Sequence, residues 1–373
     1  MNPLAPAALA HACFMPTYAG ARAHFLAAAA AAGAPTDTLV HEQARGPDGS
    51  TLSTDVAVLG PRDAERALLV VSGTHGPEGF TGSAAQIALL YRLAVQPPPA
   101  GLRIVLVHAI NPWGFAHLSR TTENNVDLNR NFIDWDAPPP DNPLYPSLHA
   151  ALTAQEWSPE ALDAAEARLQ AWIRAQGHAT FVDVLARGQY THPHGVHYGG
   201  AGREWSNRTL ETLLQRHLAG VRRIGLIDWH TGLGERGQPF FLCFNEPGDA
   251  GWERACRWWG RDRIETRAGF DGSARPRYQG LLFQGVQRYA PAAEVTGAVI
   301  EFGTLASAET RRALQADSYL KTHPGLPQDQ ARALRALLLE AFSPPDPDWK
   351  RSVLGHALRI QEQAIQGVEA WPA

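Results

Sequence analysis

Cysteine is scarce in this sequence. The 373 residues include three cysteines, Cys13, Cys243 and Cys256, an odd number without Cys-x-x-Cys spacing. This pattern argues against a disulfide framework and against a zinc site built from thiolates. A reducing compartment, the cytoplasm, is therefore the expected location.

Long apolar runs and blocks of like charge are also missing. No segment reaches the roughly 20 apolar residues of a membrane-spanning helix. The short run from Phe25 to Gly33 starts late and has little basic leader beyond Arg22, so we interpret it as an alanine-rich helix rather than a signal peptide. The 33 basic and 37 acidic residues give a net charge of -4, and the basic residues form no long run. We therefore expect neither a nucleic acid nor a membrane as partner.

Apolar runs typical of buried strands alternate with helical segments, and 45% of the residues are hydrophobic. The expected strands are 67–72, 103–109, 224–229, 239–244 and 296–301, and the expected helices are 81–93, 159–176, 328–341 and 350–366. This order predicts a three-layer α/β/α sandwich with a mixed, mostly parallel central sheet. We expect one catalytic domain over residues 1–373, with loop insertions at about 133–220.

His75 and Glu78 follow the apolar run 68–71 at a turn that contains glycine and proline. Such a sequence is typical of a buried strand that ends in a tight turn and opens a helix. Residues three apart on a first helical turn share a face, so the two side chains can converge on one point. Zinc accepts both a histidine nitrogen and a carboxylate oxygen. From these residues alone, the alternative is a capping carboxylate beside an unrelated histidine.

Three later stretches place polar residues among apolar ones. The second stretch holds Arg120 and then Asn125-Val126-Asp127-Leu128-Asn129-Arg130-Asn131-Phe132. The third is an apolar strand that ends at His230, followed by Thr-Gly-Leu-Gly, and the fourth places Glu301 within an apolar strand. Glutamate is seldom buried without a partner, so Glu301 needs an explanation.

At these four stretches the chain resembles the zinc carboxypeptidase superfamily, which includes carboxypeptidase A-like enzymes and the succinylglutamate desuccinylase and aspartoacylase group. The resemblance covers about residues 68–303 and looks most like a bacterial metallopeptidase-like branch of unknown substrate. It implies a zinc-exopeptidase-like fold. It also implies one catalytic Zn2+ bound by His75, Glu78 and His230.

The resemblance implies further roles for residues near that ion. Asp127 would orient a ligand histidine from behind, and Asn129 with Arg130 would hold a substrate carboxylate. Arg120 would polarise the scissile carbonyl, and Glu301 would be the general base.

The family's mobile tyrosine and its specificity residues are not aligned here. Tyr278 and Arg275 lie in a suitable glycine-flanked segment. Because these residues are not aligned, the choice of substrate stays open.

The residues alone support the same chemistry. Three protein ligands leave a fourth position for water, whose pKa zinc lowers toward about 7. A carboxylate such as Glu301 can take the proton of that water, and the planar fork of Arg130 suits a carboxylate ligand. Simpler interpretations remain: Glu301 could form a structural salt bridge with an arginine, Arg130 could pair with Asp127, and Arg120 could be solvated.

A glycine-rich segment at 189–200 carries three histidines, with His197 followed by Tyr198. We expect a substrate-binding loop in which these two side chains bind the substrate; a second metal ion and a loop without a role are the alternatives. His108, at the end of an apolar strand, is interpreted as a core residue or a residue behind the ligands, unless a second metal exists.

The sequence therefore predicts a zinc-dependent hydrolase that cleaves an amide bond next to a free carboxylate, with a small peptide as substrate. Within the same chemistry, the alternative is an N-acyl amino acid deacylase. From another class, the alternative is a catalytically inactive carboxylate-binding protein, although the presence of Glu301 argues against it. The sequence does not indicate an oligomeric state.

Overall fold

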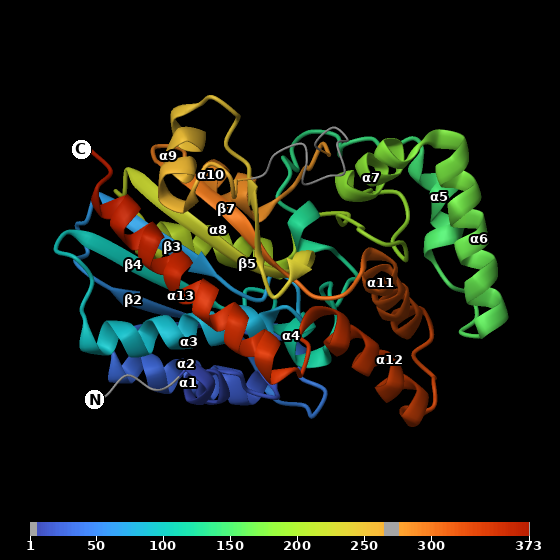
Figure 1. Ribbon diagram of the computed structural model, residues 1–373, viewed down its shortest axis with the longest axis horizontal. Coiled ribbons are helices and arrows are strands. Elements are labelled where there is room, and N and C mark those ends of the chain that lie inside the picture. Colours follow the sequence, from blue (N-terminus) through green and yellow to red (C-terminus); the bar gives the residue numbers. More distant parts are fainter. Residues whose placement is uncertain (1–5, 265–275, 373) are drawn as a thin grey trace.

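The computed structural model describes residues 6–264 and 276–372. Within them, seven strands form one sheet in the order β1-β2-β4-β3-β5-β7-β6 (Figure 1). The strands are β1 (Thr36–Arg45), β2 (Thr51–Leu59), β3 (Arg66–Val71), β4 (Leu102–His108), β5 (Arg223–Arg236), β6 (Pro239–Cys243) and β7 (Glu294–Gly303).

The four central strands β4, β3, β5 and β7 pair parallel to one another. The strands on either side, β1, β2 and β6, pair antiparallel. The predicted mixed α/β sheet is therefore confirmed, with its parallel part in the centre.

Helices cover both faces of the sheet, as expected for three layers. The alternation of side chains along β3 shows the division, because Leu68 and Val70 belong to one core cluster whereas Leu69 and Val71 belong to the other. The first cluster includes side chains of α1 (Pro6–Cys13), α2 (Tyr18–Ala31), α3 (Gly79–Val95), α9 (Ala250–Trp259) and α13 (Pro347–Glu369). The second includes side chains of α8 (Trp205–His217) and α10 (Leu282–Tyr289).

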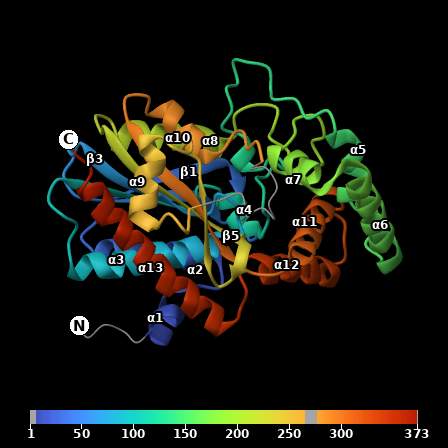
Figure 2. The same cartoon turned by 45° about the horizontal axis from the view of Figure 1, so that its top comes forward.

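A second group of helices stands beside the sheet rather than over it, at the right in both views (Figures 1 and 2). It consists of α5 (Tyr145–Leu152), α6 (Pro159–Gln176), α7 (His178–Arg187), α11 (Ser307–Thr322) and α12 (Gln328–Phe342). Helix α6 starts after Ser158, whose side chain caps the Ala161 N–H, and ends at Gly177, as the sequence predicts. The segment 133–220 thus supplies several helices as well as loops.

The register of the central strands brings the four sequence stretches to one edge. Val71 pairs with Asp228, and His230 pairs with Glu301. The turn after β3, His230 on β5 and Glu301 on β7 therefore lie together at the carboxyl edge of the regular parallel pairing, where open α/β sheets bind their ligands. Strand β5 itself continues past His230 to Arg236. The segment after β4 continues into α4 (Pro112–His117) and a short 3-10 helix, Leu128–Arg130, at the same edge.

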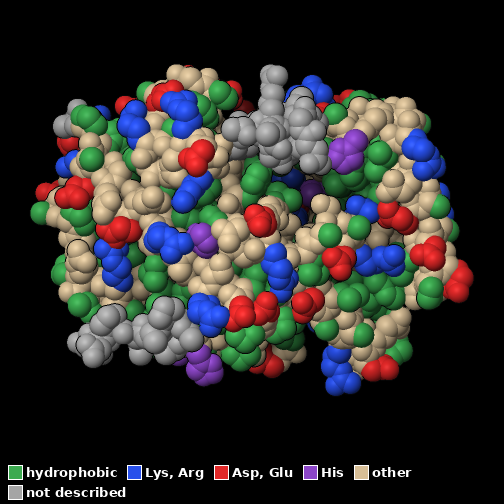
Figure 3. Space-filling view, in the orientation of Figure 1, with side chains coloured by type: hydrophobic (Ala, Val, Ile, Leu, Met, Phe, Trp, Pro, Cys, Tyr) green, Lys and Arg blue, Asp and Glu red, His purple; other side chains and the backbone are tan. Residues whose placement is uncertain are grey.

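Figure 3 shows the surface of the molecule from the same side as Figure 1. Acidic and basic side chains are intermixed on this face, and the face is hollowed right of centre. Among the described residues, no helix has the length and apolar character needed to cross a lipid bilayer.

Candidate functional site

His75, Glu78 and His230 come together at the carboxyl edge, with their ligand atoms within 4.8 Å of one another. The Nδ1 atoms of the two histidines lie 3.1 Å apart. The Glu78 carboxylate spans both, with Oε1 2.9 Å from His75 Nδ1 and Oε2 2.8 Å from His230 Nδ1. All three side chains are buried. Two nitrogens and a carboxylate in a buried cluster are typical of a zinc site.

The far nitrogen of each histidine faces a carboxylate. His75 Nε2 lies 3.0 Å from Asp127 Oδ1, and His230 Nε2 lies 2.9 Å from Asp228 Oδ2. The Asp127 carboxylate favours a proton on His75 Nε2, which leaves the Nδ1 lone pair of His75 directed at the centre of the cluster. Asp228 is itself held by the Thr74 hydroxyl at 2.8 Å. The donor set and its supports therefore fit a divalent cation.

The charges in this cluster reinforce one another. Burial raises the pKa of Glu78, but His75 and His230 outweigh that effect and hold it below its usual range. Burial lowers the pKa of His230, but Asp228 and Glu78 outweigh it and hold that pKa well above its usual value. Glu78 is therefore a carboxylate that also accepts the Thr231 N–H at 3.1 Å.

Glu301 lies beside the cluster on β7, with 8% of its surface exposed. Its Oε2 is buried and has no hydrogen-bond partner in the structure. Burial and, secondly, the nearby Glu78 carboxylate raise its pKa to about 8. No ion pair of Glu301 with an arginine is present in the described part of the chain, so the structural salt bridge considered from the sequence is not observed.

Arg120 binds Asp127 rather than solvent. Its Nη1 donates to Asp127 Oδ2 at 2.5 Å, and its side chain is 12% exposed. Burial raises the pKa of Asp127, but Arg120 and Arg130 outweigh that effect and hold it well below its usual range. Asp127 thus touches His75 with one oxygen and Arg120 with the other.

Arg130 is buried, 4% exposed, and its guanidinium has no carboxylate partner among the described residues. Its Nη1 donates to the Asn129 carbonyl at 2.6 Å, its Nη2 lies 3.4 Å from His197 Nδ1, and its Nε is buried without a partner. The ring of Tyr278 lies 5.6 Å from the guanidinium carbon. A buried cation without an anion is costly, so this position favours an anionic ligand.

Two glycines with left-handed backbones make room for Arg130. A Cβ on Gly188 (φ +77) would lie 2.6 Å from Arg130 Cδ, and a Cβ on Gly280 (φ +71) would lie 2.4 Å from the Arg130 carbonyl oxygen. Sequence reasoning missed both, together with Asp228. The glycine directly before the histidine-rich segment 189–200 could have indicated Gly188, and the aspartate two residues before His230 could have indicated Asp228.

The other expected site residues lie nearby with different contacts. Asn129 Nδ2 is 3.3 Å from His230 Nε2, and its Oδ1 accepts the Leu282 N–H at 2.8 Å. Tyr198 is buried, and its carbonyl accepts the Asp127 N–H at 2.7 Å. Among the described residues, the Tyr198 side chain makes no hydrogen bond with the His75–Glu78–His230 cluster or with Arg130. Arg275 lies outside the described residues.

His108 is a core residue. It is fully buried, its Nε2 is 2.9 Å from the Ser83 hydroxyl, and its ring stacks on Phe25. Within residues 6–264 and 276–372, the His75 cluster is the one group of three or more candidate ligands that converges. The histidine-rich segment therefore offers no second such group.

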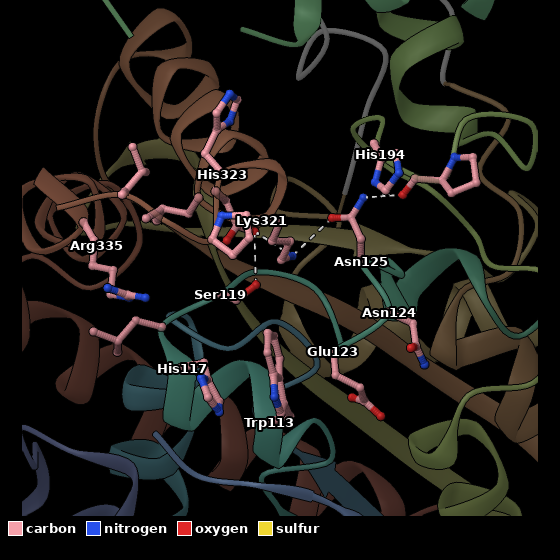
Figure 4. A pocket seen from close by; sticks show the side chains of 17 residues that line it. Trp113, His117, Ser119, Glu123, Asn124, Asn125, His194, Lys321, His323 and Arg335 are labelled. Carbon is pink, nitrogen blue, oxygen red and sulfur yellow. Dashed lines mark hydrogen bonds and ion pairs between the residues drawn. The ribbon is translucent and has the colours of Figure 1, made fainter. Parts of the chain in front are cut away.

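A separate cavity of about 510 Å³ borders the loop that carries Arg120 (Figure 4). The Asp317 carboxylate on its wall accepts the Arg120 N–H at 3.0 Å, and Lys321 Nζ bridges Asp317 and Asn125 at 3.3 and 3.2 Å. None of the three clustered ligands lines this cavity. We therefore place the candidate site at the His-Glu-His cluster, where the buried donors converge.

Several solved structures match this chain at low sequence identity. A metallo-carboxypeptidase from Burkholderia cenocepacia is 15% identical over 94% of this chain and 69% of that chain, with a TM-score of 0.43. A succinylglutamate desuccinylase from Chromobacterium violaceum is 16% identical over 82% of this chain and 74% of that chain, with a TM-score of 0.37. A murein-tripeptide amidase from Escherichia coli O157 is 19% identical over 82% of this chain and 95% of that chain, with a TM-score of 0.35.

No curated protein matches the sequence. A family model does match it, over residues 14–356, and its description is "Protein of unknown function (DUF2817)". That match spans most of the 373 residues, so the chain belongs to the DUF2817 family.

Proposed function

We propose that this protein is a zinc-dependent hydrolase that cleaves an amide bond next to a free carboxylate. The observation that carries the proposal is the buried His75–Glu78–His230 cluster with Glu301 beside it, whose buried Oε2 has no hydrogen-bond partner among the described residues. A purely structural cluster would not need a second buried acid with an unsatisfied oxygen, because such a group destabilises the fold.

His75, Glu78 and His230 would hold the zinc ion through Nδ1, a carboxylate oxygen and Nδ1. When bound, zinc lowers the pKa of water and polarises a carbonyl group. The Asp127 carboxylate would keep the proton of His75 on Nε2, away from the ion, and the Asp228 carboxylate, 2.9 Å from His230 Nε2, adds negative charge behind the second histidine.

Glu301 is suited to the proton transfers. Its Oε2 has no partner among the described residues, and burial with the nearby Glu78 carboxylate raises its pKa, so Glu301 can hold a proton once it has accepted one. In hydrolysis, Oε2 would take a proton from the attacking water and pass it to the nitrogen of the leaving amine.

Arg120 and Arg130 would bind the oxygens of the substrate. Arg120 lies on the Asp127 side of the cluster, where a donor can stabilise negative charge on the carbonyl oxygen, a contribution of about 3–4 kcal/mol in well-ordered sites. Arg130 would hold the substrate carboxylate, because its guanidinium has no acidic partner of its own among the described residues.

An N-acyl amino acid is the second candidate substrate, and burial favours it. His75, Glu301 and Arg130 are all less than 10% exposed. A site closed to this degree suits a small acyl amino acid better than a long peptide.

The test combines metal content with turnover. Purified protein should contain about one zinc per chain by plasma mass spectrometry, and His230→Ala should lose it. Wild type should release free amino acid from a panel of dipeptides and N-acyl amino acids, and a chelator should stop the release. Glu301→Gln should keep the zinc and lose at least about 100-fold in kcat.

Two results would contradict the proposal. Zinc that stays bound in His230→Ala would break the ligand set. Zinc-loaded protein that binds amino acid carboxylates without hydrolysing any member of the panel would indicate a catalytically inactive binding protein.

A further inference from the structure

His197 adopts a backbone conformation that residues other than glycine seldom take. Its φ is +57°, in the left-handed region, where a residue with a Cβ is less stable by roughly 1–2 kcal/mol. Backbone strain of this kind persists only where surrounding contacts impose it, and it concentrates at functional positions.

The segment around His197 is held on both sides. The His197 carbonyl accepts the Gln189 N–H at 3.1 Å, and the Val196 carbonyl accepts the Tyr145 hydroxyl at 2.7 Å. The next residue, Tyr198, binds the Asp127 N–H through its carbonyl. The position of the His197 ring is therefore fixed relative to Asp127 and its neighbours.

The ring of His197 reaches Arg130 with one nitrogen and leaves the other free. Its Nδ1 lies 3.4 Å from Arg130 Nη2 and 3.6 Å from Asp127 Oδ2, and only the first distance is within hydrogen-bond range. Its Nε2 is buried and has no partner among the described residues. The side chain as a whole is 10% exposed.

These contacts select one tautomer. A guanidinium can only donate, so Nδ1 must be the acceptor and Nε2 must carry the proton. Burial and, secondly, the charge of Arg120 hold the pKa of His197 well below its usual value, so the ring is neutral. Arg130 Nε is likewise buried and unpartnered. Two N–H donors at this position therefore have no acceptor among the described residues.

We propose that His197 is a specificity-determining residue whose Nε2–H donates to the substrate carboxylate bound by Arg130. The inference rests on the proposed function and deepens it, because it selects substrates that end in a free carboxylate over those that end in a carboxamide. A carboxylate offers two acceptor oxygens, whereas a primary amide would direct N–H groups at the donors of His197 and Arg130.

The experiment removes the ring without straining the backbone. His197→Gly keeps the left-handed conformation, because glycine adopts it without steric cost. The substrates are the dipeptide that wild type hydrolyses fastest and its C-terminal amide. For the free acid, kcat/KM should fall roughly 10- to 100-fold, mostly through KM, since a hydrogen bond to a charged group is lost. The amide substrate should change less than about threefold.

Rescue and a control separate this role from a structural one. Added imidazole should restore acid hydrolysis in His197→Gly, and the amide substrate in the same solution reports any effect of imidazole on the metal. His194→Gly is the matched control, because His194 is exposed in the same segment and lines the separate cavity. It should behave as wild type on both substrates. His197→Asn tolerates the same backbone, and its shorter side chain does not reach the Nε2 position, so it should show the same loss.

The outcomes distinguish this inference from the proposed function. If wild type hydrolyses the dipeptide and His197→Gly keeps its preference for the acid, the role of His197 is refuted while the hydrolase stands. Loss of zinc from His197→Gly would refute it too, because the residue would then act on the metal site. If wild type hydrolyses neither substrate, the proposed function fails. Calorimetry with N-acetylglycine and N-acetylglycinamide then decides the inference alone: equal affinities of wild type and His197→Gly for the acid would overturn it.

Discussion

Gly280 controls the position of Arg130, and alanine there should move it. A Cβ on Gly280 would lie 2.4 Å from the Arg130 carbonyl oxygen and 2.6 Å from its carbonyl carbon, whereas ordinary contacts start at 3.4 Å. The backbone must therefore separate by about 1 Å. That carbonyl also accepts the Tyr190 hydroxyl at 2.6 Å, and the Gly280 carbonyl accepts the Phe132 N–H at 3.0 Å. The atoms that must move belong to the backbone of Arg130, so no flexible side chain can relieve the clash.

Two costs add in Gly280→Ala. The left-handed backbone (φ +71) costs alanine roughly 1–2 kcal/mol, and the clash with the Arg130 peptide adds about 1–3 kcal/mol. Gly101→Ala is the matched control, because Gly101 has φ +77 and open space around its Cβ position. Gly101→Ala should be destabilised only by the cost of the left-handed backbone. A displacement of about 1 Å at the group that binds the substrate can lower kcat/KM by about 100-fold.

The measurements are chemical denaturation, zinc content and kcat/KM on the best free-acid substrate. Gly280→Ala should be less stable than Gly101→Ala by at least about 1 kcal/mol, with its zinc retained and its turnover impaired. Gly101→Ala should turn over as wild type. Equal stability and equal kcat/KM in the two variants would refute the reasoning, because the contact with Arg130 would then have no consequence.

The other expectations concern stability and the metal. Burial lowers the pKa of His108 to about 4, below its unfolded value of 6.5, so the unfolded chain binds the proton first. The stability that the neutral ring contributes is complete above about pH 6.5 and is lost as the pH falls toward 4, a change of at most about 3 kcal/mol. His108→Gln should flatten this part of the pH–stability curve. An unchanged slope would exclude His108 as its origin. Asp127→Asn should weaken zinc binding 10- to 100-fold in a competition titration and cost roughly 3–5 kcal/mol on unfolding, because Arg120 loses its buried partner. Wild-type zinc affinity and stability in that variant would show that neither His75 nor Arg120 depends on the carboxylate.

The central part of the fold could be predicted because its residues are buried on both faces. β3, β4, β5 and β7 appear as continuous apolar runs, and their expected positions differ from the observed ones mainly at the ends. The strands β1 and β2 were not expected. β1 lies at the edge with an alternating, mostly exposed pattern, and β2 buries Asp55, whose charge Arg22 neutralises at 2.7 Å. Only the tertiary partner explains such a buried aspartate.

The site shows the same limit. His75, Glu78 and His230 could be proposed together because each follows or ends an apolar strand, and parallel strands share an edge. The partner of Asp127 could not be read from the sequence, since Arg120 and Arg130 are both close in the chain and only the structure pairs Asp127 with Arg120. The space around Arg130 depends on Gly188 and Gly280, which are far away in the sequence and carry no side chain to mark them.

Asp127 is where the metal cluster and the substrate side meet. Its Oδ1 accepts the Asn129 N–H at 3.0 Å and faces His75 Nε2, while its Oδ2 takes Arg120. Asp127 thus pairs with Arg120, whereas the neighbours of the Arg130 guanidinium are the Asn129 carbonyl, the neutral His197 ring and the Tyr278 ring. If Asp127 bound Arg130 instead, the substrate carboxylate would compete with a fixed internal anion. The pairing observed here keeps one arginine in place beside the candidate metal centre and leaves the other available for an anionic ligand.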